Sequence, residues 1–340
     1  MTHWPRSLAE LHQEPPFIQG RRQIDARSTR YLWCVTSLPA SVSDIRLSGM
    51  MLDSLLQAWA GKLGGGPQEG STLAIDRRAS ASFGTERLPD PFGQSWAFAQ
   101  TLGNVATNHE TVLRESLQGF ANGQTSKPIT VVTTMARVVL ESLALQAWLI
   151  DPSVSTRERF ARWTALEYQS ELKSWQIVSP NVPRLDNPIA RQLFRDAQRF
   201  SLDVDKKPIP DWIGANVPAS TKLAGLLAQR FATYADTGAT EVGSVGETFY
   251  RLFSREIHGS VGSVLALLLP TNMVDPSGQP ALTYDLSHGA LWSAMGLVLI
   301  STFASSCTYA EWLGLPVDRE AHRLHIHHVK LAIRKVTEVR

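Results

Sequence analysis

Two long apolar segments, residues 131–150 and 289–307, most strongly limit what this chain can fold into. Each is about as long as a membrane-spanning helix. The first, however, contains Arg137, Glu141 and Gln146, which are expensive to place in lipid, and serine recurs through the second. We therefore predict two helices buried in the core of a helical bundle, with membrane spans as the alternative.

Helical periodicity continues from residue 91 to the end of the sequence, and no strand pattern is found there. Ser155 and Glu158 form a capping box, and Asp285 or Ser287 is placed to cap the second apolar segment. A break near Gly103 stays open as an alternative for the first helix. The expected helices cover residues 92–122, 129–150, 157–178, 187–202, 220–235, 245–269, 290–312 and 318–339.

Residues 1–90 have a mixed pattern. Residues 44–62 show helical spacing, whereas residues 64–91 begin with three glycines, have no sustained period and predict an irregular linker. We therefore predict an all-α fold. It consists of a helical bundle over residues 91–340 that follows a mixed or irregular N-terminal segment of residues 1–90.

Charge and cysteine content limit the compartment and the partners. The 340-residue chain has a formal net charge of +2, which is too small to require a nucleic-acid partner. Its two cysteines, Cys34 and Cys307, provide neither a metal framework nor a disulfide scaffold. The first residues lack the apolar core of a signal peptide. We expect a cytoplasmic protein.

A stripe of charged residues on the expected helix 245–269 is the main candidate site. At about 100° per residue, Glu247, Arg251, Arg255 and His258 fall within roughly 80° of one another. Beyond His258 the helix is apolar nearly all round, so we expect the stripe where a solvated face meets a packed interior. The alternative is an ordinary solvated face on which Glu247 and Arg251 form an ion pair.

Arg251, six intervening residues and His258 resemble the signature of the HEPN superfamily, helical-bundle proteins of defence, toxin–antitoxin and RNA-processing systems. The resemblance covers at most residues 125–270. It implies a metal-independent ribonuclease that uses no cofactor and forms a homodimer in which two motif helices face each other. Residues 136–163 also resemble a set of uncharacterised bacterial all-helical proteins.

The HEPN resemblance implies a role for each residue of the stripe. His258 would deprotonate the ribose 2′-OH or protonate the leaving 5′-oxygen. Arg251 would hold the scissile phosphate and stabilise its charge in the transition state, and Arg255 would assist it. Glu247, one turn before Arg251, would support these groups without contacting RNA.

Arg137 and Glu141 are the only charged residues in the apolar segment 131–150, and they lie on one helix face. Because an unpaired buried charge is costly, each needs a partner. One interpretation is a structural ion pair between the two residues. The other is that Glu141 orients Arg251 or His258 from across the bundle.

Four histidines, His322, His325, His327 and His328, lie in the basic C-terminal helix. Only His325 and His328 share a face, so the four rings cannot converge on one metal ion from a straight helix. We expect no metal site, and we interpret this helix as a basic surface that is either exposed or in contact with a polyanion.

Two other functions are compatible with the sequence. The first is a non-catalytic interaction or regulatory protein that uses the bundle surface and the C-terminal helix to bind a protein partner. The second is a membrane-associated protein that uses residues 289–307. The sequence contains no P-loop, Rossmann glycine pattern, HExxH, CxxC pair or GxSxG elbow, which argues against the enzyme classes that carry those motifs.

Overall fold

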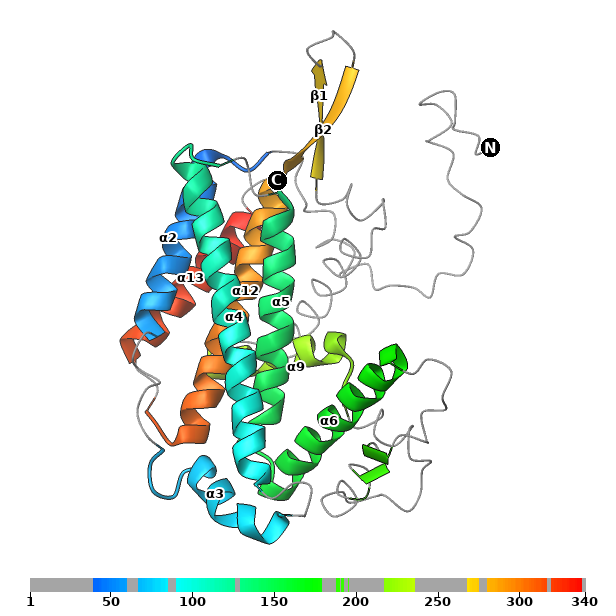
Figure 1. The fold of residues 1–340 in the computed structure, drawn as a ribbon. Helices are drawn as coiled ribbons and strands as arrows, with labels where there is room; N and C mark the ends of the chain where they lie inside the picture. Colours follow the sequence, from blue (N-terminus) through cyan, green and yellow to red (C-terminus); the bar gives the residue numbers. More distant parts are fainter. Residues whose placement is uncertain are drawn as a thin grey trace, which may run out of the picture.

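The computed structural model describes residues 39–59, 67–84, 90–125, 129–178, 188–189, 191–192, 195, 217–235, 268–274, 280–316 and 319–337. Within these ranges the chain is a bundle of helices with one two-stranded hairpin (Figure 1), so the all-α prediction is confirmed. The elements are α2 (Val42–Trp59), α3 (Thr72–Phe83), α4 (Pro91–Ala121), α5 (Ile129–Leu149), α6 (Thr156–Val178), α9 (Ser220–Tyr234), β1 (Leu268–Val274), β2 (Pro280–Leu286), α12 (His288–Leu313) and α13 (Arg319–Thr337).

Helix α12 is the centre of the bundle. It packs against α5, α13, α9, α2 and α3, and nearly all of its side chains are buried. Ser287 caps its first turn, as predicted, because the Ser287 hydroxyl accepts a hydrogen bond of 3.0 Å from the backbone N–H of Ala290. Gly314 ends the helix with a φ of 72°, a left-handed conformation that glycine adopts without strain.

The two apolar segments fold as core helices. Among the described residues, α12 is the one helix long and apolar enough to cross a membrane. Its most apolar stretch of 18 residues is 94% buried inside the protein. Helix α5 packs along α12 and buries Val132, Ala136 and Leu140. Packing within the protein therefore accounts for the apolar composition of both segments.

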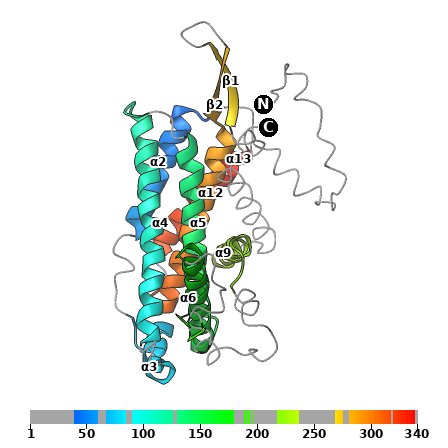
Figure 2. The same ribbon diagram turned by 45° about the vertical axis from the view of Figure 1, so that its right-hand side comes forward.

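The long helices α2, α4, α5 and α12 lie side by side, and α13 packs behind them against α12 and α2 (Figure 1, Figure 2). Helix α9 crosses the bundle and packs against α5 and α12. Helix α3 covers one end of the bundle, α6 extends away from that end, and the hairpin projects from the opposite end.

Two apolar clusters form the core. The larger one joins α2, α4, α5, α9, α12 and α13, so α2 shares a core with the helices that follow residue 91. The smaller one lies at the α3 end and contains large side chains of α6 and α12, including Trp163, Tyr168 and Trp312. The division of the chain at residue 90 stays a prediction.

The prediction of an irregular linker over residues 64–91 is wrong for residues 72–83, which form α3. Ser71 caps this helix by accepting a hydrogen bond of 3.1 Å from the N–H of Ala74. Its three buried residues are Leu73, Asp76 and Ser80, two of them polar. Because α3 is anchored largely by polar groups, it lacks the apolar stripe by which a helix is recognised.

The expectation of no strand after residue 90 is also wrong, because β1 and β2 pair antiparallel from Leu268 with Leu286 to Val274 with Pro280. The prediction of a helix over residues 245–269 is therefore wrong for residues 268 and 269, which belong to β1, and residues 245–267 lie outside the described residues. Pro270 would interrupt a helix, whereas both strands of a two-stranded sheet are edge strands, where a missing N–H is tolerated.

The remaining helix predictions agree with the structure where it describes the chain. Helix α4 is continuous through Gly103, so the alternative of a break there is wrong. The hydroxyl of Ser155 accepts a hydrogen bond of 3.2 Å from the N–H of Glu158, which forms half of the predicted capping box. Only residues 188–189, 191–192 and 195 of the expected helix 187–202 are described.

Candidate functional site

The residues of the predicted nuclease site lie outside the described residues. Glu247, Arg251, Arg255 and His258 all belong to the stretch 236–267, of which the structure describes nothing. Their assignment as catalytic and supporting residues therefore stays a prediction. A candidate site on the described part of the chain has to be sought among other side chains.

Arg137 and Glu141 form an ion pair along α5. Nε and Nη2 of Arg137 each lie 3.0 Å from Oε1 of Glu141. The side chains are 14% and 33% exposed, so the pair lies at the edge of the core. This geometry agrees with the interpretation as a structural ion pair, and the proposed orienting role of Glu141 stays a prediction.

The C-terminal histidines do not form an exposed row. His325 is buried, its Nε2–H donates a hydrogen bond of 2.7 Å to the carbonyl of Leu299, and burial lowers its pKa to about 3. The rings of His322 and His325 both contact Phe303 edge-on. The interpretation as an exposed surface is therefore wrong for His325. Among the described residues, no group of three or more His, Cys, Asp or Glu side chains is arranged to hold a metal ion.

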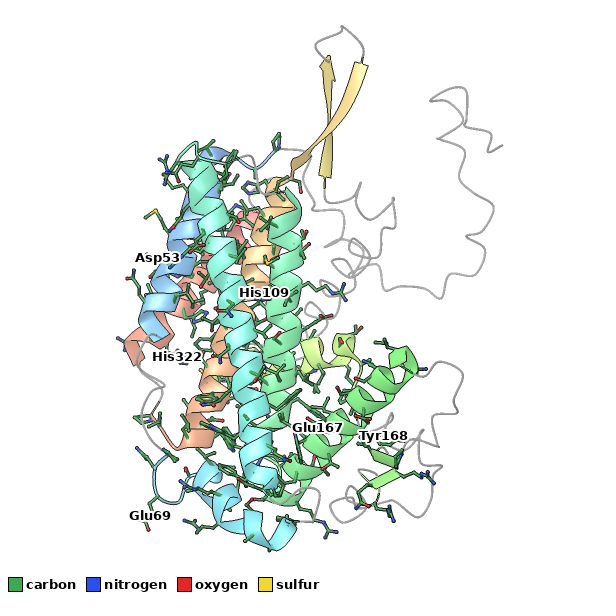
Figure 3. All side chains as sticks on the ribbon, viewed as in Figure 1. Asp53, Glu69, His109, Glu167, Tyr168 and His322 are labelled. Atoms are coloured by element: carbon green, nitrogen blue, oxygen red, sulfur yellow. The ribbon has the colours of Figure 1, made fainter. Side chains whose placement is uncertain are left out.

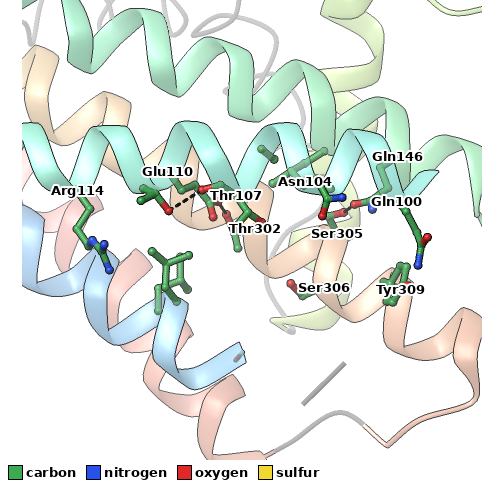
Figure 4. A pocket seen from close by; sticks show the side chains of 16 residues that line it. Gln100, Asn104, Thr107, Glu110, Arg114, Gln146, Thr302, Ser305, Ser306 and Tyr309 are labelled. Carbon is green, nitrogen blue, oxygen red and sulfur yellow. Dashed lines mark hydrogen bonds between the residues drawn. The ribbon is translucent and has the colours of Figure 1, made fainter. Parts of the chain in front are cut away.

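A cleft of about 590 Å³ lies between α4 and α12, with contributions from α2 and α5. Figure 4 shows Arg114 at one end of the cleft, Glu110 and Thr302 in the middle, and Gln100 and Tyr309 at the other end. Most of the lining side chains are polar but uncharged. The full lining is Leu55, Leu56, Gln100, Gly103, Asn104, Ala106, Thr107, Glu110, Thr111, Arg114, Leu143, Gln146, Thr302, Ser305, Ser306 and Tyr309.

Glu110 is the distinctive group in this cleft. Its side chain is 2% exposed, and among the described residues its only hydrogen-bond partner is the hydroxyl of Thr302, which contacts Oε1. Burial raises the pKa of Glu110 to about 7, and the Thr302 contact opposes this only in part. A large fraction of Glu110 side chains therefore carry a proton at neutral pH.

Thr302 on α12 is the hydrogen-bond partner of Glu110. Its hydroxyl lies 2.9 Å from the carbonyl of Val298, one turn earlier in α12, and also contacts Glu110. A hydroxyl has one proton, and the Val298 carbonyl can only accept. The one proton of Thr302 is therefore shared between Oε1 of Glu110 and the carbonyl of Val298, and both of these oxygens accept from the hydroxyl.

Hydrogen bonds hold the wall of the cleft in place around Gln146, towards the Gln100 end (Figure 4). Nε2 of Gln146 donates to the carbonyl of Ala99 at 2.9 Å, and the hydroxyl of Ser305 donates to Oε1 of Gln146 at 2.7 Å. Gly103 makes room for this amide, since a Cβ at position 103 would lie 2.8 Å from Nε2. Both ends of Gln146 are thus fixed before any ligand arrives.

The charge of Arg114 at the end of the cleft is already compensated. Its Nη1 lies 3.2 Å from Asp53 on α2, and its Nη2 lies 3.5 Å from Glu115 (Figure 3 labels Asp53). Tyr309 is uncharged, because burial raises the pKa of its phenol above the ordinary value. Glu110 is therefore the one carboxyl group in the lining, and it forms no ion pair with any residue that the structure describes.

Sequence reasoning overlooked Glu110, although a signal was present. Ala106, Glu110, Leu113 and Leu117 follow one another at spacings of four, three and four residues, and all four are buried. A carboxylate at a core position of an amphipathic helix is unusual enough to mark a candidate site. The partner, Thr302, could not be identified in the same way, because hydroxyl groups are common inside helices.

Comparison with protein-family models, with curated proteins and with solved structures found no match to this chain.

Proposed function

We propose that this protein is a non-catalytic, regulatory helical bundle that binds a small polar ligand in the cleft between α4 and α12. The observation that carries the proposal is the position of Glu110, a buried carboxyl group without a charged partner beside about 590 Å³ of open space. Burying such a group opposes folding, and an apolar side chain would fill the space better. A ligand that interacts with the carboxyl group would account for its presence.

The size and lining of the cleft support this proposal. Sites for small molecules commonly have volumes of about 300–1,000 Å³ and carry a few polar groups at fixed positions. The Gln146 amide is held by Ala99 and Ser305, so little conformational freedom would be lost there on binding. The main rival explanation is a cleft filled by water alone, since polar hollows of this size hold ordered water.

A substitution that blocks the cleft distinguishes ligand binding from a cleft filled by water alone. Thr107 lines the cleft from an exposed position on α4, so Thr107→Trp fills the space without disturbing the core. Thr101→Trp is the matched control, because Thr101 is exposed on the same helix but does not line the cleft. A library of polar metabolites is screened by ligand-detected NMR. We expect compounds that bind the unmodified protein and Thr101→Trp but not Thr107→Trp. If no compound shows this pattern, the proposed function is wrong.

The second candidate function is metal-independent RNA cleavage, which is favoured by one observation, the spacing of Arg251 and His258. In this proposal RNA is the substrate, two copies of the chain form the site, and Arg255 assists Arg251. We expect His258→Ala and Arg251→Ala each to abolish cleavage without changing the helical circular-dichroism spectrum, and EDTA to have no effect. Full cleavage by both variants would exclude the nuclease. Glu110→Gln is the control that should cleave normally.

A further inference from the structure

We infer that the ligand of the cleft carries a cationic nitrogen, and that Glu110 releases its proton to solvent when this nitrogen binds. The inference rests on the proposed function and names the chemistry of its ligand. In the binding step, the neutral carboxyl group loses one proton and the resulting carboxylate pairs with the ligand cation. The net charge at Glu110 therefore stays zero, because a neutral carboxyl group is replaced by a balanced ion pair, and one proton appears in solution.

The charges around the cleft favour a cation over an anion. Among the lining residues from α2, α4, α5 and α12, only Glu110, Arg114 and Tyr309 can ionise. Arg114 already faces two carboxylates, Asp53 and Glu115. An anion entering the cleft would meet these acids and an ionising Glu110, whereas a cation would find in Glu110 a carboxyl group that forms no ion pair with Arg114, which is held by Asp53 and Glu115.

The hydrogen-bonding groups near Glu110 also fit a cationic nitrogen. Oε1 of Glu110 contacts Thr302, whereas Oε2 has no hydrogen-bond partner among the described residues. An ammonium group needs about three acceptors. Oε2 provides one, and the side-chain oxygens of Asn104 and Thr107, which line the same stretch of α4, can provide others.

Proton release makes the affinity depend on pH in a defined direction. Below a pH of about 7, where Glu110 is mainly protonated, the ligand competes with the proton. Affinity should therefore rise about tenfold for each pH unit up to that value and then level off. A ligand that binds a neutral carboxyl group by hydrogen bonds alone would show the opposite trend, because it would lose its partner as Glu110 ionises.

A series of compounds of equal length tests the inference. Putrescine, aminobutanol, butanediol and succinate share a four-carbon chain and differ in charge. Isothermal titration calorimetry in buffers with different ionisation heats reports both affinity and protons released. We expect putrescine and aminobutanol to bind at about pH 6, with the release of nearly one proton each, and to bind about fivefold more tightly at about pH 7, where about half of the Glu110 side chains are already ionised. Butanediol and succinate should not bind.

Two substitutions provide the controls. Glu110→Gln should abolish the preference for amines and the proton release, whereas Glu69→Gln, at an exposed position outside the cleft, should change neither. Binding of succinate or butanediol in preference to the amines would overturn the inference. So would the failure of both amines to bind. In either case the proposed function is judged separately, by whether Thr107→Trp blocks the compounds found in the wider screen.

Discussion

Two carboxyl groups in this protein are equally buried but have very different hydrogen-bond and ion-pair partners. Asp76 in α3 and Glu110 in α4 are each 2% exposed. Oδ1 and Oδ2 of Asp76 accept hydrogen bonds of 2.6 and 2.8 Å from the guanidinium group of Arg159, and Trp312 donates a third of 3.1 Å. Within the described part of the chain, Glu110 is paired with the hydroxyl of Thr302 and with no cation.

The difference shows what each carboxyl group contributes. Asp76 joins three elements, because Arg159 lies on α6 and Trp312 on α12. Its charge is matched and its lone pairs are used, which is the condition under which a buried ion is tolerated. Glu110 joins only α4 and α12 and lies beside open space. Asp76 therefore stabilises the fold, whereas the burial of Glu110 opposes folding and is explained only by the proposed binding function.

The largest effect is expected where the matched pair is broken. Asp76→Asn keeps the shape of the side chain but leaves the charge of Arg159 buried without a counter-charge. We expect the free energy of unfolding, measured by urea denaturation, to fall by about 3–5 kcal/mol.

The control for this change is Asp53→Asn, which removes the partner of Arg114 in a pair whose side chains are 26% and 37% exposed. Solvent screens this pair, so we expect a loss of no more than about 1 kcal/mol. Equal losses for Asp76→Asn and Asp53→Asn would remove the distinction between a structural carboxylate and an ordinary surface one.

Glu110→Gln should change the pH dependence of the unfolding free energy, which sharpens the comparison of Glu110 with Asp76. Because burial raises the pKa of Glu110 from 4.5 to about 7 in the folded state, the folded protein binds more protons than the unfolded chain between these values. Stability contributed by this group is therefore present below about pH 4.5 and is lost as the pH rises to about 7. Gln does not titrate, so the variant should gain on the order of 3 kcal/mol relative to the unmodified protein across this range.

The measurement is the difference in unfolding free energy between the two proteins at several pH values, so that all shared titrations cancel. A difference that does not change with pH would mean that Glu110 has an ordinary pKa, and the contrast with Asp76 would then be lost.

The smallest effect concerns the fixed wall of the cleft. Gly to Ala in the interior of a helix usually stabilises it by about 0.5–1 kcal/mol. At Gly103 the added Cβ would lie 2.8 Å from Nε2 of Gln146, so we expect Gly103→Ala to give no gain and a loss of about 1 kcal/mol.

Gly296→Ala in α12 is the matched control, because the nearest atom to its new Cβ is 3.9 Å away and the usual gain should be seen. Thermal denaturation compares the two variants. If both are stabilised alike, Gln146 is not held as tightly as its hydrogen bonds indicate.

Much of the bundle could be predicted from the sequence, because its main helices carry their own signals. The burial of α5 and α12 follows from their apolar composition, and Ser155 and Ser287 cap helices where the capping rules place them. Helix α3 could not be predicted in this way. It depends on the contact between Asp76 and Arg159, which is 83 residues later in the chain. Local periodicity in the sequence does not reveal such a contact.

The hairpin and the cleft could not be predicted from the sequence, for related reasons. The apolar residues that lead into Leu268 fit a buried helix and a strand equally well, and only Pro270 favours the strand. Glu110 interrupts an apolar stripe, but its burial depends on α12. Its partner on that helix, Thr302, is 192 residues later in the sequence. Contacts between distant segments, rather than local preference, create this site.

The most direct test of the difference between the two carboxyl groups is the pKa of Glu110 itself. It can be followed by carbon NMR of protein labelled in its glutamate side chains, with the resonance assigned by its disappearance in Glu110→Gln. We predict titration at a pH of about 7. Titration close to 4.5, the ordinary value for a glutamate, would show that the carboxyl group is solvated or paired in solution and would contradict the account of the cleft.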